Sequence, residues 1–211
     1  FSGECCENKR YKKFNDKYLQ ENFDLILHFT PTDLERKYLR FPLWLLYVPK
    51  YNMDNKNDNI ITYVEEKRKE NMNKPKKLLG SCVARHDPSG KRSSILGKLS
   101  KYGVVGCPGR WPPPRKQKIG DKREDKIKYI SETTYNICAE SHKGLMYCSE
   151  KIFEAYIGGT IPIYWSNDGI PEKDILERNS YCLNDEEEIR KMMENNKKYK
   201  ESRVFKPGSE K

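Results

Sequence analysis

Glu150 and Lys151 are the neighbouring charges in this sequence that are best placed to bind a ligand. They follow Ser149, whose hydroxyl suits the cap of a helix that Gly158 and Gly159 would end. A helix N-terminus offers unpaired N–H groups and a positive dipole end, which favour phosphate, and Lys151 adds a full positive charge. A carboxylate such as that of Glu150 accepts hydrogen bonds from a ribose diol. The pattern predicts a nucleotide site, although an exposed helix that turns Glu and Lys to water fits the same spacing.

Two elements must position this pair. Apolar side chains recur at helical spacing from Ile152 to Ile157, which predicts one buried helix face. The following segment, Thr160 to Trp165, is short and apolar, as in a buried parallel strand. Pro162 weighs against a strand, because proline cannot donate to the ladder.

Arg92 is a second candidate for phosphate binding. The sequence predicts a strand at 78–84, a turn-rich loop, a helix beginning at Arg92 and a strand at 102–105. Such a unit binds nucleotides at the carboxyl ends of its strands. An arginine at the start of its helix can fork onto a diphosphate. The nearby Ser89-Gly90-Lys91 run lacks the order of a P-loop.

The remaining elements are predicted from apolar runs and charge order. Residues 7–22 are predicted as a loop or surface helix, 120–131 as a charged segment that is helical or solvent-facing, and 185–199 as a helix with an acidic start and a basic end. Strands are expected at 23–29, 135–139 and 181–183, and an apolar core segment at 38–47. Residues 52–77 form the clearest linker, with an exposed helix in their second part, and Lys74, Lys76 and Lys77 are expected to face water.

Composition narrows the classes of function. The chain has 211 residues and a net charge of +10, which favours phosphates, nucleic acids or anionic membranes as partners. Its seven cysteines include no Cys-x-x-Cys pair, which predicts reduced thiols and no metal site. No apolar run approaches the length of about 20 residues that a membrane span needs.

The run from Tyr147 to Trp165 resembles the nucleotide-binding signature of the α-1,3-fucosyltransferases, glycosyltransferase family 10, in its bacterial and viral style. That signature reads Tyr-Val-Thr-Glu-Lys, a short helix, then Thr-Ile-Pro-Ile-Tyr-Trp-Gly. This chain has Cys148-Ser149 in place of Val-Thr and Ser166 in place of the last Gly. Further blocks resemble the family at Ser2-Gly3-Glu4-Cys5, 23–29, 37–47 and 135–141.

The resemblance implies an α/β fold of the glycosyltransferase-B type with a Rossmann-like donor domain and a parallel sheet. Residues 78–211 would be the GDP-sugar donor domain, 52–77 a charged linker or helix, and 1–51 the end of a partial acceptor-side domain. The chain would then be the C-terminal, donor-binding portion of such an enzyme.

The implied reaction moves L-fucose from GDP-fucose to an N-acetylglucosamine hydroxyl of an oligosaccharide, in α-1,3 linkage and with inversion. The family's roles carry over as follows: Glu4 as general base, Arg92 and Lys151 on the diphosphate, Tyr147 near the guanine, Glu150 on the ribose and Ser141 in place of a family Asn. No Asp-x-Asp motif is present. The expectation is therefore no tightly bound cofactor or metal, and at most a stimulatory divalent metal.

Two alternatives stay open. One is a truncated or degenerate protein that binds GDP-sugar without turnover. The other is a basic nucleic-acid-binding domain, suggested by the charge and by interleaved aromatic residues, although no nucleic-acid motif is present. On the leading interpretation nucleic acid is not a partner, and the oligomeric state stays undetermined. The expected location is cytoplasmic for a bacterial or viral protein, or the Golgi membrane for a eukaryotic one with a preceding anchor.

Overall fold

The computed structural model describes residues 15–29, 31–46, 60–112, 118–141, 146–166, 181–182, 189–191 and 193–194. A five-stranded parallel sheet is its centre, in the order β4-β3-β5-β6-β7. These strands span Val105–Gly106, Leu78–Ser81, Thr133–Ala139, Ile161–Trp165 and Tyr181–Cys182. The predicted parallel α/β sheet is confirmed, with each strand close to its expected place.

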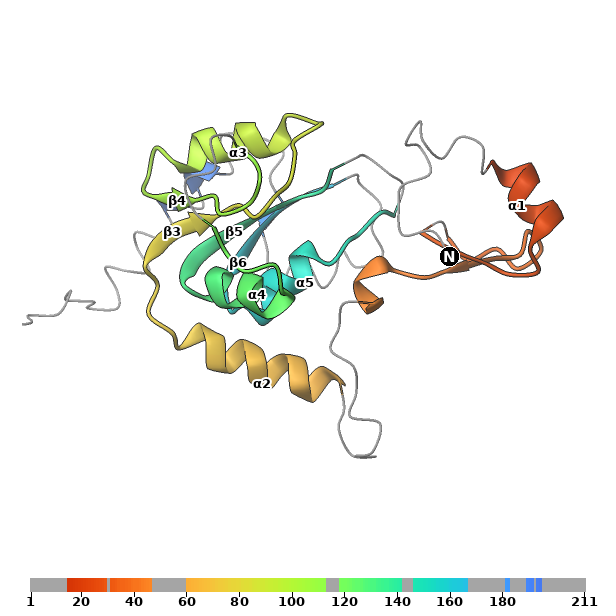
Figure 1. Cartoon of the computed structure of the whole chain (residues 1–211), viewed down its shortest axis with the longest axis horizontal. Coiled ribbons are helices and arrows are strands. Elements are labelled where there is room, and N and C mark those ends of the chain that lie inside the picture. Colours follow the sequence, from red (N-terminus) through yellow and green to blue (C-terminus); the bar gives the residue numbers. More distant parts are fainter. Residues whose placement is uncertain are drawn as a thin grey trace, which may run out of the picture.

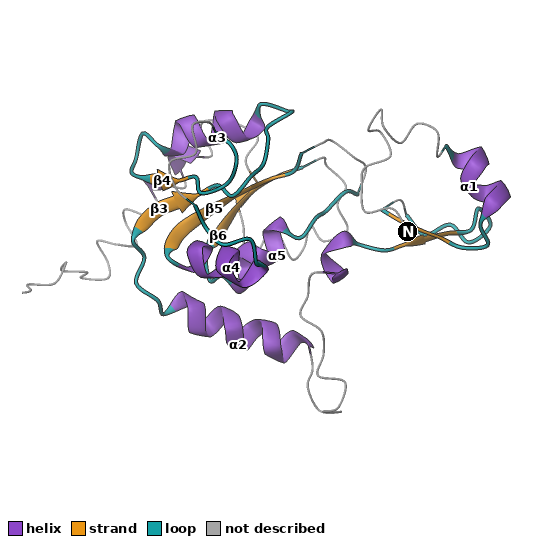
Figure 2. Cartoon of the chain, in the orientation of Figure 1, coloured by secondary structure: helices purple, strands orange, loops and turns teal. Residues whose placement is uncertain are grey.

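Helices cover both faces of this sheet (Figures 1 and 2). Helix α3 (Lys91–Leu99) lies on one face, while α4 (Arg123–Ser131) and α5 (Lys151–Ile157) lie on the other. The central strand β5 is therefore buried along most of its length. This burial explains its run of apolar side chains, which is typical of a parallel strand covered on both sides.

The chain reverses its direction of winding between β3 and β5. From β3 it crosses through α3 to β4 on one side, and then returns through α4 to β5 on the other side of β3. In open parallel sheets, ligands bind in the crevice outside the carboxyl ends of the strands at such a switch point. The fold thus places the region after Ser81 and Ala139 where a nucleotide is expected.

Pro162 lies inside β6, paired in register with Asn136 of β5. The objection that proline raises to a strand is therefore overridden by the sheet around it. Buried side chains flank this pair, including Tyr135, Ile137 and Ile163. Tertiary packing of this kind outweighs one missing ladder donor.

The N-terminal elements form a small separate sheet. Strand β1 (Ile26–His28) pairs in parallel with β2 (Tyr38–Arg40), after helix α1 (Asp16–Asn22). The expected core segment at 38–47 divides into β2 and a 3-10 helix, η2 (Leu43–Leu46). Trp44 of η2 stacks on Phe153 of α5, with ring centroids 4.1 Å apart. This contact joins the N-terminal elements to helix α5, which covers the five-stranded sheet.

Helix α2 (Ile60–Met72) forms where an exposed helix was predicted in the second part of 52–77, and most of its described side chains are exposed. Its last turn is anchored on α5, because the Asn71 amide donates to the Ile157 carbonyl at 2.8 Å. Arg68 donates to the Tyr156 carbonyl at 3.1 Å. Lys76 is exposed, as expected, but its ammonium group also donates to the carbonyls of Asn71, Ser131 and Gly159. The reason is that α2, α4 and α5 end close to this point, and the last carbonyls of a helix lack partners within the helix.

Four cysteines in the described part of the chain are free thiols, namely Cys82, Cys107, Cys138 and Cys148. The expected helix at 185–199 lies mostly outside the described residues, although residues 189–191 and 193–194 are helical. No helix in the described segments is long and apolar enough to cross a membrane.

Candidate nucleotide-binding site

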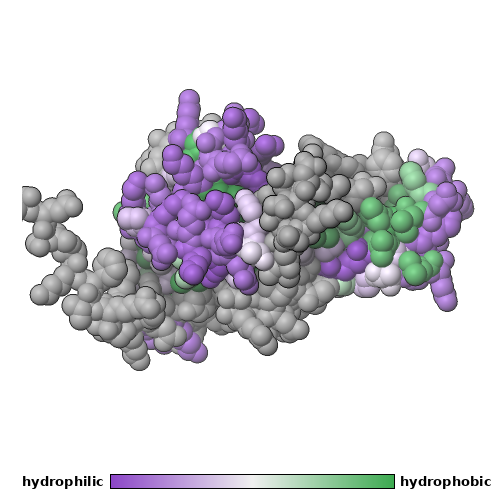
Figure 3. All heavy atoms as spheres, turned by 90° about the horizontal axis from the view of Figure 1, so that it is seen from below, coloured by the Kyte–Doolittle hydropathy of each residue, from purple (hydrophilic) through white to green (hydrophobic). Residues whose placement is uncertain are grey.

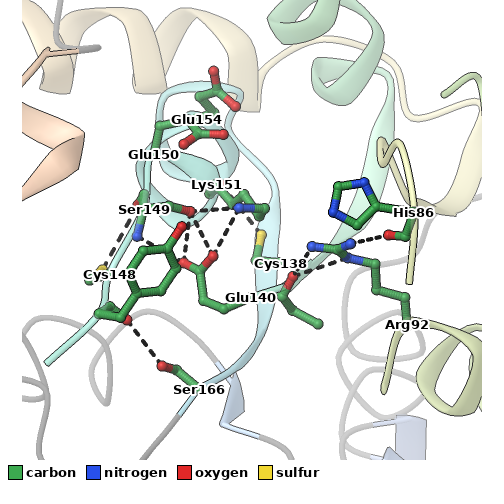
Figure 4. Close-up of polar contacts among 12 residues, drawn as sticks. His86, Arg92, Cys138, Glu140, Cys148, Ser149, Glu150, Lys151, Glu154 and Ser166 are labelled. Carbon is green, nitrogen blue, oxygen red and sulfur yellow. Dashed lines mark hydrogen bonds and ion pairs between the residues drawn. The ribbon is translucent and has the colours of Figure 1, made fainter. Parts of the chain in front are cut away.

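Lys151 begins α5 and is held by a buried carboxylate, that of Glu140 (Figure 4). Its ammonium group donates to Glu140 Oε2 at 2.9 Å and to Ser149 Oγ at 2.7 Å. Ser149 donates from both its backbone N–H and its hydroxyl to the same carboxylate, at 2.7–2.8 Å. Glu140 directly follows β5, so this network fixes Lys151 to the carboxyl end of the central strand.

These contacts correct the predicted helix cap. The Ser149 hydroxyl binds Glu140 rather than the first turn of α5, and the N-cap position is Glu150, without a side-chain cap. The buried carboxylate is the stronger partner, because a hydrogen bond to a charged acceptor outweighs one between neutral groups. Lys151 still lies in the first turn of the helix, as expected, and is its first residue.

The charges around Lys151 keep it protonated. Burial alone would lower the pKa of this lysine, but the carboxylates of Glu140 and Glu150 and the hydrogen bond to Glu140 raise it above its ordinary value. Burial likewise favours a higher pKa for Glu150, yet Lys151 and Lys126 lower it overall. Both predicted site residues are therefore ionised at neutral pH.

A second network supports Glu150 from helix α4. Lys126 lies 3.9 Å from Glu150 and makes a close ion pair with Glu154. Arg123 of the same helix lies 3.4 Å from Glu154. Burial raises the pKa of Glu154 despite the lowering effect of Lys126. Sequence reasoning missed this pairing, because α4 and α5 are adjacent only after the sheet has formed.

Arg92 lies at the switch point, on the second residue of α3. Its guanidinium group donates to the Ala139 carbonyl from Nε at 3.2 Å and from Nη2 at 2.9 Å, and it makes a close contact with the His86 carbonyl. The side chain is buried, with 4% exposed. Three of its five N–H groups thus donate to backbone carbonyls, so Arg92 connects the end of β5 to the loop that contains His86.

Asp87 occupies the N-terminus of α3. Its carboxylate accepts the backbone N–H groups of Arg92 at 3.2 Å and Ser93 at 2.8 Å, and the Ser93 hydroxyl at 2.7 Å. Burial would raise the pKa of Asp87, but these hydrogen bonds and the charge of Arg92 lower it. Sequence reasoning missed this contact, because Asp87 lies before the N-cap residue Gly90 and outside the usual spacing of a capping side chain.

Tyr147 and Ser141 complete the same edge. Tyr147 is buried against Phe29, at the end of β1, with ring centroids 4.8 Å apart and the rings edge to face. Its carbonyl accepts the Ser166 hydroxyl at 3.1 Å, so the residue that replaces the family's Gly ties the β6 end to this loop. Ser141 directly follows Glu140 and is partly exposed. Glu4 lies outside the described residues.

The structure therefore gathers Arg92, Ser141, Glu150 and Lys151 at the carboxyl edge of the sheet, beside Tyr147. Among the described residues, no group of three or more His, Cys, Asp and Glu side chains is placed to hold a metal ion. Such an edge, with cations at a topological switch point, suits a phosphate ester or a nucleotide.

Comparisons with known proteins agree with this geometry. The chain is 26% identical over 163 residues to the α-(1,3)-fucosyltransferase FucT of Helicobacter pylori, a match that covers 74% of this chain and 32% of that protein. A crystal structure of an α1,3-fucosyltransferase has a TM-score of 0.58 at 20% identity, over 85% of this chain and 58% of the other. The chain resembles the α-1,3-fucosyltransferases.

A second α1,3-fucosyltransferase structure, with GDP, has a TM-score of 0.50 at 22% identity and covers 71% of this chain and 48% of the other. No protein-family model matches. The likeness to fucosyltransferase structures confirms the expected α/β fold of the glycosyltransferase-B type. The chain spans about a third of the length of the curated fucosyltransferase that it matches.

Proposed function

We propose that this chain forms the donor-binding part of a fucosyltransferase that uses GDP-fucose. The observation that carries the proposal is the position of Arg92 and Lys151, both tied to the carboxyl end of β5 at the switch point of a parallel sheet. The sequence match to a fucosyltransferase supports the choice of donor among nucleotide sugars.

In the proposed reaction, an N-acetylglucosamine hydroxyl of an oligosaccharide attacks the anomeric carbon of L-fucose, in α-1,3 linkage and with inversion. GDP leaves with its negative charge, which Lys151 stabilises by electrostatic attraction. Lys151 donates two of its three N–H groups to Glu140 and Ser149, so the third can bind a phosphate oxygen. Glu4 is the proposed general base for the acceptor hydroxyl, in keeping with the resemblance at residues 2–5.

Other residues of this edge would position the donor. Arg92 contributes positive charge and two further N–H groups, and Glu150 would accept from the ribose, as acidic residues do in other nucleotide folds. Tyr147 would flank the guanine and Ser141 would donate or accept one hydrogen bond. GDP-fucose enters as a substrate, and an oligosaccharide is the acceptor.

The first experiment is GDP titration by calorimetry on this chain and on Lys151→Ala. Loss of one charged hydrogen bond is expected to weaken binding by about 1.5–3 kcal/mol, or about 10- to 100-fold. Lys77→Ala is the matched control, because Lys77 pairs with Glu132 at the opposite end of β5, at 2.9 Å. No GDP binding by a chain with native circular dichroism would contradict the donor site.

Arg92 calls for a subtler substitution. Arg92→Lys keeps the charge but cannot reproduce the fork that holds Ala139 and His86. Weaker GDP binding by this variant at an unchanged charge would support a role in orientation. If GDP binds, turnover of GDP-fucose with an oligosaccharide acceptor is measured next, with Glu4→Gln as the test of the base. Binding without turnover would favour the alternative of a donor-binding portion that is inactive alone.

A further inference from the structure

Glu140 is a buried acid at the proposed donor site, and it is not one of the residues proposed to bind GDP-fucose. Its side chain is fully buried, with 0% exposed, and it directly follows β5. Oε1 accepts the Ser149 backbone N–H at 2.8 Å, and Oε2 accepts the Lys151 ammonium at 2.9 Å, with the Ser149 hydroxyl within 2.8 Å of both oxygens. Each oxygen of the carboxylate is thus used twice.

A buried carboxylate is costly unless it is paired, and replacing such a pair by apolar residues is often neutral or stabilising. Stability alone therefore gives a weak reason for a charged pair at this place. A nucleotide site gives a stronger reason for the pair, because a largely buried lysine needs a fixed counter-charge to stay protonated and oriented toward the ligand. The carboxylate is held by Ser149 independently of the lysine, so it is a rigid support.

We propose that Glu140 is a positioning residue for GDP: it fixes the ammonium group of Lys151 at the carboxyl end of β5, charged and oriented toward the diphosphate. This inference rests on the proposed function, because it assigns a partner to the lysine that binds the donor. Glu140 itself does not touch the nucleotide.

The surroundings of Glu140 support a central place in the site. The carbonyl that precedes it, on Ala139, is the one that Arg92 binds, and the Glu140 backbone N–H donates to the Trp165 carbonyl at 3.0 Å. The end of β5 is thus hydrogen-bonded to β6, and the same end binds the side chains of Arg92 and Lys151. A displacement of Glu140 would move Lys151 and Arg92 together.

The test compares two substitutions that flank the same strand. Glu140→Gln removes the charge but keeps the size and the capacity to accept from Ser149. Glu132→Gln does the same for the exposed pair with Lys77, just before β5. GDP affinity at pH 7 is expected to fall by about 10- to 100-fold in the first variant and to stay unchanged in the second.

The pH dependence separates positioning from a merely structural role. The groups that face the Lys151 ammonium or its neighbours are Glu140, Cys138 and Tyr147, with Glu150 beside it and Lys126 across from α4. Without Glu140, burial lowers the pKa of Lys151 and only the charge of Glu150 and a smaller effect of Tyr147 remain to oppose it. The ratio of wild-type to Glu140→Gln affinity should therefore rise from pH 7 to pH 9. This ratio cancels the titration of GDP itself.

A ratio that does not change with pH would overturn the proposal, as would equal GDP affinities of Glu140→Gln and Glu132→Gln. No GDP binding by the folded wild-type chain would overturn both this inference and the proposed function. Wild-type binding with an unaffected Glu140→Gln would overturn only the positioning role.

If Glu140→Gln does not fold, the pair is replaced together as Glu140→Gln with Lys151→Met, which leaves no buried charge unpaired. Its GDP affinity is compared with that of Lys151→Met alone. Equal affinities are expected, because Glu140 acts through the lysine. A further loss in the double variant would show that Glu140 acts independently, against the proposal.

Discussion

At the scale of single residues, backbone conformation and close packing limit which side chains a position accepts. Gly159, for example, has φ of +63° and follows α5, where the sequence predicted a helix end. A Cβ at this position would lie 2.4 Å from the Met72 backbone nitrogen. Gly159 thus serves both the end of α5 and the close approach of α2. Only the helix end was predictable from the sequence.

Gly159→Ala is expected to lower the free energy of unfolding by about 2–4 kcal/mol, because left-handed backbone and overlap with α2 both oppose a side chain. Gly97→Ala in α3 is the control, since no atom lies within 4 Å of its added Cβ. That change should stabilise the chain by about 0.5–1 kcal/mol through helix propensity. Denaturant unfolding measures both, and equal effects would contradict the packing of α2 on Gly159.

The cysteines give a second prediction at this scale. Burial raises the pKa of Cys82 to about 12 and that of Cys138 above its ordinary value, whereas Cys107 is only partly buried. Among Cys82, Cys107, Cys138 and Cys148, thiol labelling followed by peptide mass spectrometry should modify Cys107 first. Cys82 and Cys138 should react only as the chain unfolds, even when the pH is raised from 7 to 9, because the thiolate is the reactive form. Rapid labelling of Cys138 in the folded chain would contradict its place beneath α5.

At the scale of elements, the crossover from β3 to β6 was largely predictable and the position of α2 was not. Apolar periodicity predicts the strands and helices. It also places Arg92 and Lys151 at the N-termini of two of the predicted helices. Helix α2 instead binds backbone carbonyls of α5, which have no signature in the sequence. The Glu140–Lys151 pair was missed for a related reason, since its two members come from different elements and meet only in the sheet.

Asn71→Ala tests the anchoring of α2. Removal of the buried amide leaves the Ile157 carbonyl without this donor and should cost about 1–3 kcal/mol of unfolding free energy. Asn73→Ala, two residues later and exposed, should change stability by less than about 0.5 kcal/mol. Chemical unfolding followed by circular dichroism distinguishes them, and a neutral Asn71→Ala would mean that α2 is held elsewhere.

At the scale of the whole molecule, the net charge of +10 is spread rather than concentrated. The described residues on the side shown in Figure 3 are mostly hydrophilic, while hydrophobic side chains gather at the end formed by the N-terminal elements. Exposed hydrophobic residues of the N-terminal segment include Phe23, Leu25 and Leu34. The charge alone suggested nucleic acid, but the arrangement of the sheet edge favours a small phosphorylated ligand.

Salt separates these two kinds of partner. A nucleic-acid-binding chain with six to ten phosphate contacts would lose about 10³- to 10⁵-fold in affinity between 50 and 200 mM salt. GDP bound mainly by Arg92 and Lys151 should lose less than about tenfold over the same range, because few charges are involved. Fluorescence titration with labelled oligonucleotide and with GDP gives both slopes. A steep slope for oligonucleotide together with no GDP binding would favour the nucleic-acid interpretation.

The attachment of both cations to the end of β5 also bears on folding. Arg92 comes from the crossover between β3 and β4 and Lys151 from the one between β5 and β6, so neither can reach its place until β3, β5 and α5 have assembled. A ligand that bridges them would bind only the completed sheet and would stabilise it by mass action. The concentration of this ligand in the cell would then influence how fast proteases degrade newly made chains, independently of sugar transfer.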